Sequence, residues 1–161
     1  METWLAIASK RDLRDYASTP IPPDVEQRIL DAGRISGSSR NTQKWEFVVV
    51  ESAKQELAAT VYAPENVATA ALVIAIVGDA FPFDVGRASQ NMMLAAWDQG
   101  VASCPNGIAD RDAATRVLGG DPKMIISFGY LAKPRDVEAR TAEEWSARAK
   151  RAPLDELVRR V

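Results

Sequence analysis

The stretch Ala70-Ala71-Leu72-Val73-Ile74-Ala75-Ile76-Val77 is apolar at every position. A strand with one face in water alternates apolar and polar residues, whereas a strand that is covered on both faces is apolar throughout. The stretch therefore predicts a buried, central strand with other elements packed on both sides of its sheet.

The segments on either side of this strand predict alternating helices and strands. Asp24 is expected to cap a helix that follows the prolines of residues 20–23. Turn-forming residues at 104–107 predict a loop after the longest helix. The expected helices are 4–8, 25–33, 53–62, 85–101 and 111–118, and the other expected strands are 47–50 and 124–130. This order of elements favours α/β layers over a helical bundle.

Bulk composition narrows the functional classes. The chain has 161 residues, which fits a single domain over 1–161, and 47% apolar with 26% charged residues is typical of a globular protein. A net charge of −2 gives no positive field for nucleic acid. No signal peptide or membrane-spanning run is visible, and the single cysteine excludes an intrachain disulfide, so we expect a cytoplasmic protein without a membrane partner.

The sequence contains no histidine. This excludes the commonest general base, Ser-His catalysis and every zinc site that uses histidine. Cys104 is most simply a small buried hydrophobe, and Asp110 with Asp112 is better explained as helix capping than as a hydrolytic pair. Chemistry must then come from carboxylates, lysine, tyrosine, the thiol or a bound cofactor, and no metal site is expected.

A basic segment near the N-terminus, Lys10-Arg11-Asp12-Leu13-Arg14-Asp15-Tyr16, resembles the Arg-Arg-Ser-x-Arg-x-Phe motif of the FMN-dependent nitroreductase family. The resemblance implies that Lys10, Arg11, Asp12 and Arg14 hold the FMN phosphate and the pyrimidine edge of the flavin, where cations stabilise anionic charge. Asp12 stands where the family has Ser, and a carboxylate at that position repels a phosphate unless a neighbouring cation neutralises it. Without the other motifs, the segment would be explained as a solvated helix face.

A polar segment ahead of residues 47–50, Ser38-Ser39-Arg40-Asn41-Thr42-Gln43-Lys44-Trp45-Glu46-Phe47, is similar to the family's Pro-Ser-Ser-x-Asn-x-Gln-Pro-Trp-x-Phe. In that family, short hydroxyl and amide side chains approach the flavin from the other subunit, which implies this role for Ser38, Ser39 and Asn41. The alternative is a turn whose hydroxyls bond to their own backbone. Gly37 and Lys44 replace the family's prolines.

Two further segments complete the resemblance, which spans nearly the whole chain. The run from Gln90 to Gly100 is similar to the family's Gln-Asn-x-x-Leu-Ala-Ala helix, whose apolar residues pack in the core. The loop after it supplies a backbone N–H to flavin N5, and the matching positions are Pro105, Asn106 and Gly107. Near the C-terminus, Lys150 and Arg151 match the basic residues that bind the FMN phosphate, whereas Lys133 and Arg135 are better explained as exposed charges.

The resemblance implies an α+β fold of three layers, with a central mixed or antiparallel sheet flanked by helices, in an intertwined homodimer with two FMN sites. It implies an oxidoreductase in which NAD(P)H reduces FMN, and a nitroaromatic, a quinone or a similar electron-poor acceptor then takes the electrons by a ping-pong mechanism. The flavin carries the chemistry, so no side chain is expected to be catalytic. One alternative is a flavin-binding or flavin-sequestering protein of the same fold without turnover. Another is a partner-binding protein whose flavin loop has decayed.

Overall fold

The computed structural model describes residues 1–161 and divides them into two compact units. The larger unit is Arg11–Pro134, and the smaller unit joins Met1–Lys10 to Arg135–Val161. Each unit has its own core. That the whole chain forms one domain stays a prediction.

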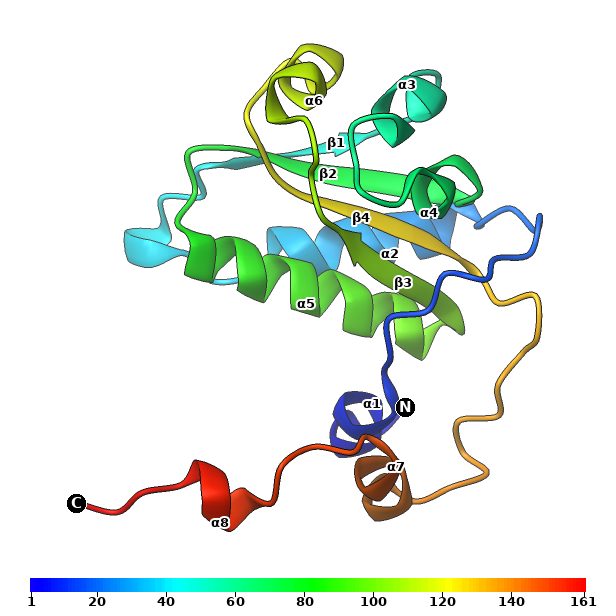
Figure 1. Ribbon diagram of the computed structural model, residues 1–161, viewed down its shortest axis with the longest axis vertical. Helices are drawn as coiled ribbons and strands as arrows, with labels where there is room; N and C mark the ends of the chain where they lie inside the picture. Colours follow the sequence, from blue (N-terminus) through cyan, green and yellow to red (C-terminus); the bar gives the residue numbers. More distant parts are fainter. The chain divides into compact units, whose positions relative to one another are not determined.

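A four-stranded antiparallel sheet forms the centre of the larger unit (Figure 1). Its strands, in spatial order, are β1 (Trp45–Val49), β2 (Leu72–Gly78), β4 (Pro122–Tyr130) and β3 (Val101–Asn106). Ile74 lies opposite Val49 on one side and Ile126 on the other. β2 is thus an inner strand, as its apolar sequence predicts, and the sheet is antiparallel and not mixed.

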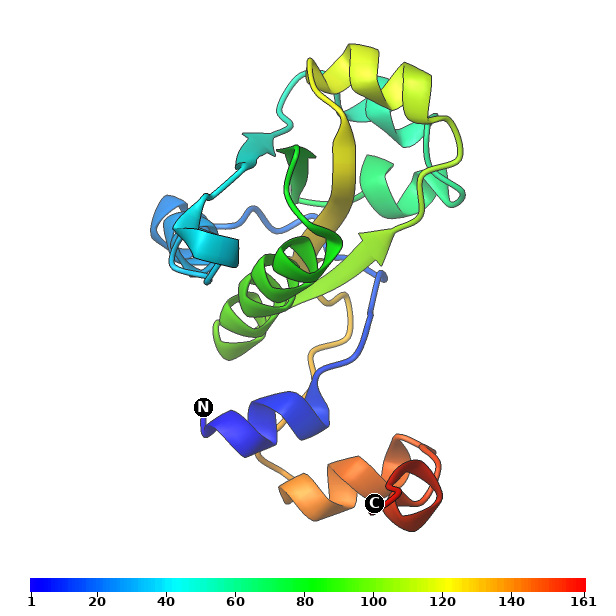
Figure 2. The same ribbon diagram turned by 90° about the vertical axis from the view of Figure 1, so that its left-hand side faces the viewer.

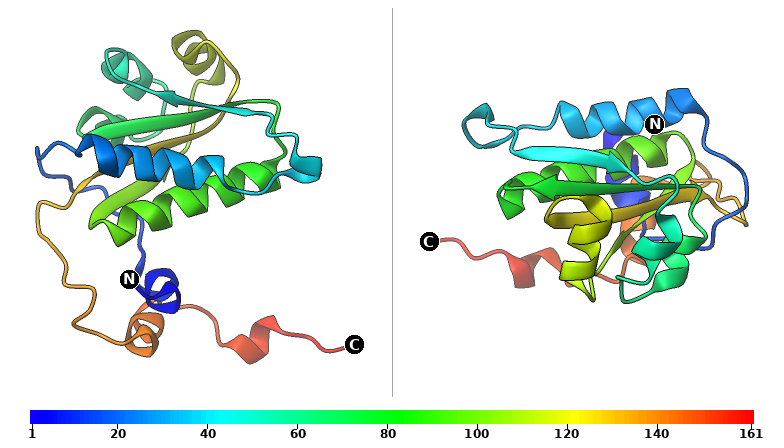
Figure 3. Two further views of the ribbon diagram at one scale, coloured as in Figure 1. Left: turned by 180° about the vertical axis from the view of Figure 1, so that it is seen from behind. Right: turned by 90° about the horizontal axis from the view of Figure 1, so that it is seen from above.

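Helices cover both faces of this sheet and make three layers (Figures 1 and 3). The helices on one face are α2 (Pro23–Arg34) and α5 (Pro82–Asp98), and those on the other are α3 (Lys54–Ala58), α4 (Pro64–Ala68) and α6 (Arg111–Leu118). Alternate residues of β2 serve the two faces: Ile74 packs in the α2/α5 core, and Val73 packs in the core of the other three helices. The predicted α+β three-layer architecture is confirmed.

The smaller unit consists of three short helices, α1 (Thr3–Ser9), α7 (Ala142–Arg148) and α8 (Leu154–Leu157). Trp145 of α7 packs against Ala8 of α1, and its Nε1 donates to the Val137 carbonyl oxygen at 2.9 Å. Figure 2 shows α1 and α7 side by side. A capping box between Thr141 and Glu144 starts α7. Every residue of α8 is exposed.

Three predictions about local structure are wrong. Asp24 does not cap α2, because Pro22 occupies the N-cap and Pro23 the first helical position, which suits proline. The long helix begins earlier, at Pro82, and ends at Asp98, before the strand residue Val101. Residues 104–106 are the end of β3 and not a loop. An edge strand tolerates the missing N–H of a proline, so turn-forming residues there do not prevent pairing.

Candidate functional site

The segment after α1 is held against the edge strand β3 and the C-terminal end of β4. Leu13 N donates to the Ser103 carbonyl oxygen at 3.2 Å, and Ala17 N donates to the Tyr130 carbonyl oxygen at 2.8 Å. An isolated parallel bridge also pairs Asp12 with Ser103. A strand rises roughly 3.3 Å per residue, so the end of β3 lies roughly 10 Å from Ser103. The structure therefore brings Arg11, Asp12 and Arg14 to the same edge of the sheet as residues 105–107.

Tyr16 anchors this segment through a buried polar network. Its hydroxyl lies 3.1 Å from the Ser127 carbonyl oxygen and 3.0 Å from Ser127 Oγ. Asn106 Nδ2 donates to Ser127 Oγ at 3.2 Å and to the Cys104 carbonyl oxygen at 3.0 Å. Burial raises the pKa of the Tyr16 phenol well above its ordinary value, an effect that the hydrogen bond with Ser127 opposes. The phenol therefore stays protonated and acts as a structural link between the basic segment and the end of β3.

Close packing around the Tyr16 ring depends on Gly129. A Cβ atom added at Gly129 would lie 2.8 Å from Cδ1 and Cγ of Tyr16, which is closer than Cβ atoms lie to non-bonded atoms in proteins. Glycine at this position of β4 lets the ring lie flat on the strand. Gly129 lies in the predicted strand 124–130, but its role as the seat of Tyr16 was not predicted.

Pro105, Asn106 and Gly107 differ in what they present to solvent. Asn106 is buried, and its side chain turns inward to β4, so only its backbone is available to a ligand. Gly107 is exposed, and its carbonyl oxygen accepts from Tyr62 N at 3.0 Å. The Tyr62 ring beside it is 78% exposed and was not predicted as a site residue. The end of β3 and Gly107 after it thus present backbone rather than side chains to a ligand.

Two polar atoms beside this edge have no partner within the chain. They are Ser103 Oγ and Asn106 Oδ1, and both are buried. Buried polar atoms in native proteins are nearly always hydrogen-bonded, so such atoms mark places where a further group is expected nearby. Cys104, between them in sequence, is 3% exposed with its Sγ 3.3 Å from the Pro105 carbonyl oxygen, which agrees with an inert thiol.

The Ser38–Asn41 segment forms a tight turn that includes η1 (Ser39–Asn41). Arg40, Asn41 and Gln43 all have left-handed backbone angles, with φ of 53°, 56° and 48°. Non-glycine residues adopt this region at a cost, so the turn needs external support. Ser38 Oγ supplies part of it by accepting from Gln43 N at 3.0 Å.

Helix α5 supplies the rest of that support. The buried carboxylate of Asp84 accepts the Ser39 N–H at 2.9 Å, and Asn91 Nδ2 donates to Ser36 Oγ at 2.8 Å. Asp84 and Asn91 are seven residues apart and so share one face of the helix. Asp84 was not predicted as a site residue. An acidic residue just ahead of the predicted helix 85–101 was the available signal, but it is explained equally well as a helix cap.

Within one chain these two parts of the predicted flavin site lie apart. In Figures 1 and 3 the turn at η1 and the segment after α1 are at opposite ends of the sheet. The predicted phosphate ligands Lys10, Lys150 and Arg151 belong to the smaller unit, and Lys150 and Arg151 are exposed. The larger unit alone therefore assembles Arg11–Arg14 with residues 105–107, and it does not bring the Ser38–Asn41 turn to them.

The structure contains neither a metal-binding cluster nor a membrane-spanning helix. No three acidic or cysteine side chains come together in a way that could hold a metal ion. No helix is both long enough and apolar enough to cross a membrane.

Comparison with known families decides the relationship. The model of the family described as "Nitroreductase family" matches residues 7–80 and 58–130, which is most of the chain. The chain belongs to the nitroreductase family. The resemblance noted in the sequence is confirmed.

Solved structures and a curated relative agree with this membership. A nitroreductase family protein of Streptococcus pneumoniae is 18% identical with a TM-score of 0.83, and the match covers 99% of this chain and 100% of that one. A provisionally named nitroreductase of Desulfovibrio desulfuricans, solved in complex with FMN, is 23% identical with a TM-score of 0.79 over 98% and 96% of the two chains. A Methanothermobacter thermautotrophicus protein with the provisional name NADH dehydrogenase/NAD(P)H nitroreductase is 26% identical over 144 residues, 81% of this chain and 75% of its own.

Proposed function

We propose that this nitroreductase-family protein is an FMN-dependent oxidoreductase that passes electrons from NAD(P)H to nitroaromatic, quinone or similar electron-poor acceptors by a ping-pong mechanism. The observation that carries the proposal is the Tyr16–Ser127–Asn106 network, which ties the basic segment Arg11–Arg14 to the turn at Gly107 on one edge of the sheet. The FMN complex of the Desulfovibrio relative and the name of the Methanothermobacter relative support the same cofactor and donor.

The residues available fit a flavin mononucleotide. The guanidinium of Arg11 would bind the phosphate through charge-assisted hydrogen bonds. The family motifs imply the same role for Lys10, Lys150 and Arg151, which belong to the smaller unit. Asp12 and Arg14 would face the polar edge of the ring system, and the backbone of residues 105–107 would lie against its reactive centre. The hydroxyl of Ser103, which is buried at this edge without a hydrogen-bond partner, also favours a further group nearby.

The bound flavin would supply hydride acceptance at N5 and electron transfer onward, and the protein would supply charge and orientation. This division of labour fits a chain that contains no histidine and no metal-binding cluster. Gly107, which carries no side chain, leaves its backbone accessible beside the exposed ring of Tyr62. Ser38, Ser39 and Asn41 would contact the same flavin from a second copy of the chain.

A homodimer is therefore part of the proposal. The separation of the Ser38–Asn41 turn from the Arg11–Arg14 segment leaves each copy with two half-sites, which a two-fold dimer would join. Large apolar side chains on both N- and C-terminal helices are also exposed, among them Trp4 at 54% and Leu154 at 75%. We also propose a cytoplasmic location, with which the buried free thiol of Cys104 is compatible.

Equilibrium FMN binding to the purified protein tests the assigned phosphate ligands. Replacing Arg11 or Arg151 with alanine removes a charge-assisted bond and should weaken FMN binding by roughly 1.5–3 kcal/mol, or about 10- to 150-fold in Kd. Arg116→Ala is the matched control, because Arg116 is an exposed cation on α6 outside the proposed site. Unchanged FMN affinity in both site variants would refute the assignment.

A further inference from the structure

A hollow of about 540 Å³ lies in the larger unit beside the first turn of α5. Its volume is within the range of about 300–1,000 Å³ that is usual for small-molecule sites. Its lining includes Lys44, Phe81, Gly86, Arg111, Lys123 and Met124. None of these residues was predicted to bind the flavin.

Three cations from separate elements face the hollow. Lys44 directly precedes β1, Arg111 begins α6, and Lys123 is on β4. The carboxylates close to them are Asp79, 3.5 Å from Lys44 Nζ, and Asp121. The three cations outnumber the two carboxylates by one positive charge, so the hollow suits a ligand with a single negative charge.

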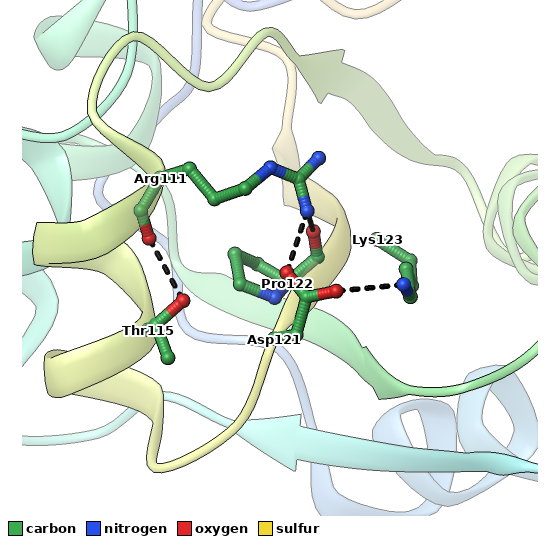
Figure 4. A network of polar contacts seen from close by, with 5 residues as sticks. All are labelled: Arg111, Thr115, Asp121, Pro122 and Lys123. Atoms are coloured by element: carbon green, nitrogen blue, oxygen red, sulfur yellow. Dashed lines mark hydrogen bonds and ion pairs between the residues drawn. The ribbon is translucent and has the colours of Figure 1, made fainter.

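Asp121 holds two of these cations in fixed positions (Figure 4). Its Oδ1 lies 2.6 Å from Arg111 Nη1, and its Oδ2 lies 2.7 Å from Lys123 Nζ. The same Arg111 nitrogen donates to the Pro122 carbonyl oxygen at 2.9 Å. Hydrogen bonds from Lys123 and Arg111 lower the pKa of Asp121, so the carboxylate stays ionised and keeps both cations in place. A ligand would meet a cation pair that is already ordered, which reduces the entropy cost of binding.

The remaining wall of the hollow is apolar. Phe81, Val85 and Met124 supply aromatic and aliphatic surface, and the Phe81 side chain is 59% exposed. Such exposure of a large apolar ring is explained if a flat ligand covers it. Gly86 of α5 also faces the hollow, and a Cβ atom placed on it would meet nothing within 4 Å. The space beside α5 is therefore open.

We infer that this hollow binds an aromatic carboxylate, with the carboxylate beside Arg111 and Lys123 and the ring against Phe81 and Met124. Aromatic acids are then the preferred class of electron acceptor, a conclusion that rests on the proposed function. The hollow adjoins the proposed flavin contacts, because Lys44 follows the Ser38–Gln43 turn and Asp84, in the first turn of α5, holds Ser39.

The redox step balances without a further reactant. Reduction of a nitro group to a nitroso group takes up two electrons and two protons and releases water. NAD(P)H supplies the electron pair and one proton as hydride, and solvent supplies the second proton. The carboxylate takes no part in the redox change and serves only to bind the acceptor.

Calorimetric titration with benzoate, which is not reducible, tests the site without turnover. We expect saturable binding that weakens with salt and that falls at least about fivefold in Lys123→Gln and in Arg111→Gln. Arg116→Gln removes a cation from the same helix as Arg111, outside the hollow, and should bind benzoate normally. No saturable binding, or equal binding by all three variants, overturns the inference.

Two substitutions at Gly86 test the hollow without altering its charge. Gly86→Leu should fill the space and abolish benzoate binding, while leucine in place of glycine favours the helix and maintains the thermal stability. Gly86→Ala adds one methyl group and should retain binding within about threefold. Normal benzoate affinity in a folded Gly86→Leu protein overturns the inference.

Steady-state kinetics with 4-nitrobenzoate and 4-nitrobenzamide separate this inference from the proposed function. The two acceptors have nearly the same shape and differ in charge, so Lys123→Gln should lower kcat/KM for the benzoate at least about fivefold more than for the amide. An equal effect on both refutes the acceptor assignment even if benzoate binds. If the protein reduces neither compound and oxidises no NAD(P)H, the proposed function fails, whatever the benzoate titration shows.

Discussion

At the scale of single residues, Asp84 is the carboxylate that supports the Ser38–Asn41 turn. Asp84 is only 4% exposed, and a buried charge is unfavourable unless hydrogen bonds within the protein replace those to water. Asp84 gains the Ser39 N–H at 2.9 Å, lies 3.8 Å from Arg87 Nη1, and occupies the first turn of α5, where the helix dipole favours negative charge. The same contacts hold a turn with three left-handed residues.

Asp84→Ala should therefore loosen the turn. Loss of the acceptor leaves Ser39 N–H without its partner, and we expect the free energy of unfolding to fall by about 1–3 kcal/mol in urea titrations. FMN affinity should fall as well, if Ser39 and Asn41 contact the flavin. Asp84→Asn retains an oxygen acceptor and should recover much of both losses. Tight FMN binding in a folded Asp84→Ala protein would show that the turn does not contact the flavin.

Ionisation of the Tyr16 phenol makes the free energy of unfolding depend on pH in the alkaline range. Its pKa is raised by burial, so the folded state keeps the phenol neutral, whereas in the unfolded chain the phenol ionises near pH 10. The stabilisation is fully present below about pH 10 and is lost above it, at up to about 1.4 kcal/mol per pH unit. At neutral pH, Tyr16→Phe should cost about 1–2 kcal/mol for the bonds to Ser127. Urea unfolding between about pH 9 and pH 11 should show this difference shrinking; a constant difference would contradict the account.

At the scale of elements, two glycines should respond in opposite ways to the same change. Gly119 ends α6 with φ of 71° and donates its N–H to the Thr115 carbonyl oxygen at 2.9 Å, whereas Gly86 is inside α5. A Cβ at either position meets nothing within 4 Å, so only the backbone matters. Gly119→Ala should destabilise by about 1–2 kcal/mol, and Gly86→Ala should stabilise by about 0.5–1 kcal/mol. Urea midpoints that shift in the same direction would contradict this.

Elements with a strong local pattern were predictable from the sequence. The apolar run of β2 and the Arg111–Leu118 helix were both confirmed, because burial and capping are encoded within a few residues. The strand character of residues 104–106 was missed, because it depends on pairing with β4 some twenty residues away. α7 was also missed, although Thr141 and Glu144 have the spacing of a capping box.

The candidate site, like the fold, was predictable from the sequence only in part. The motif residues Arg11–Arg14 and 105–107 could be placed on one edge only through Tyr16 and Ser127, which are 111 positions apart in the chain. No local periodicity encodes such a contact. Nothing in the sequence shows whether the Asp84 carboxylate holds a loop or only interacts with the dipole of its own helix. The hollow beside Gly86 arises from four segments and was invisible before folding.

At the scale of the whole molecule, a shared flavin site predicts complementation between subunits. Arg11→Ala and Asn41→Ala each damage a different half-site, so both homodimers should bind FMN weakly. In a heterodimer, one site carries both lesions and the other carries none. After unfolding and refolding an equal mixture, roughly a quarter of all sites should regain wild-type affinity, as random pairing in a two-fold dimer requires. No recovery in an FMN titration, with dimers shown by light scattering, would place both residues in the same subunit's site.

Anaerobic reduction shows whether this nitroreductase-family protein turns over a bound flavin with NAD(P)H. The purified protein, loaded with FMN, is mixed with NADH or NADPH without oxygen, and its flavin absorbance is followed. We predict bleaching by at least one nucleotide at a rate that saturates with concentration, and recovery of the absorbance when a quinone is added. A flavin that stays bound and fully oxidised with both nucleotides would contradict the proposed oxidoreductase activity and leave a flavin-binding protein without turnover.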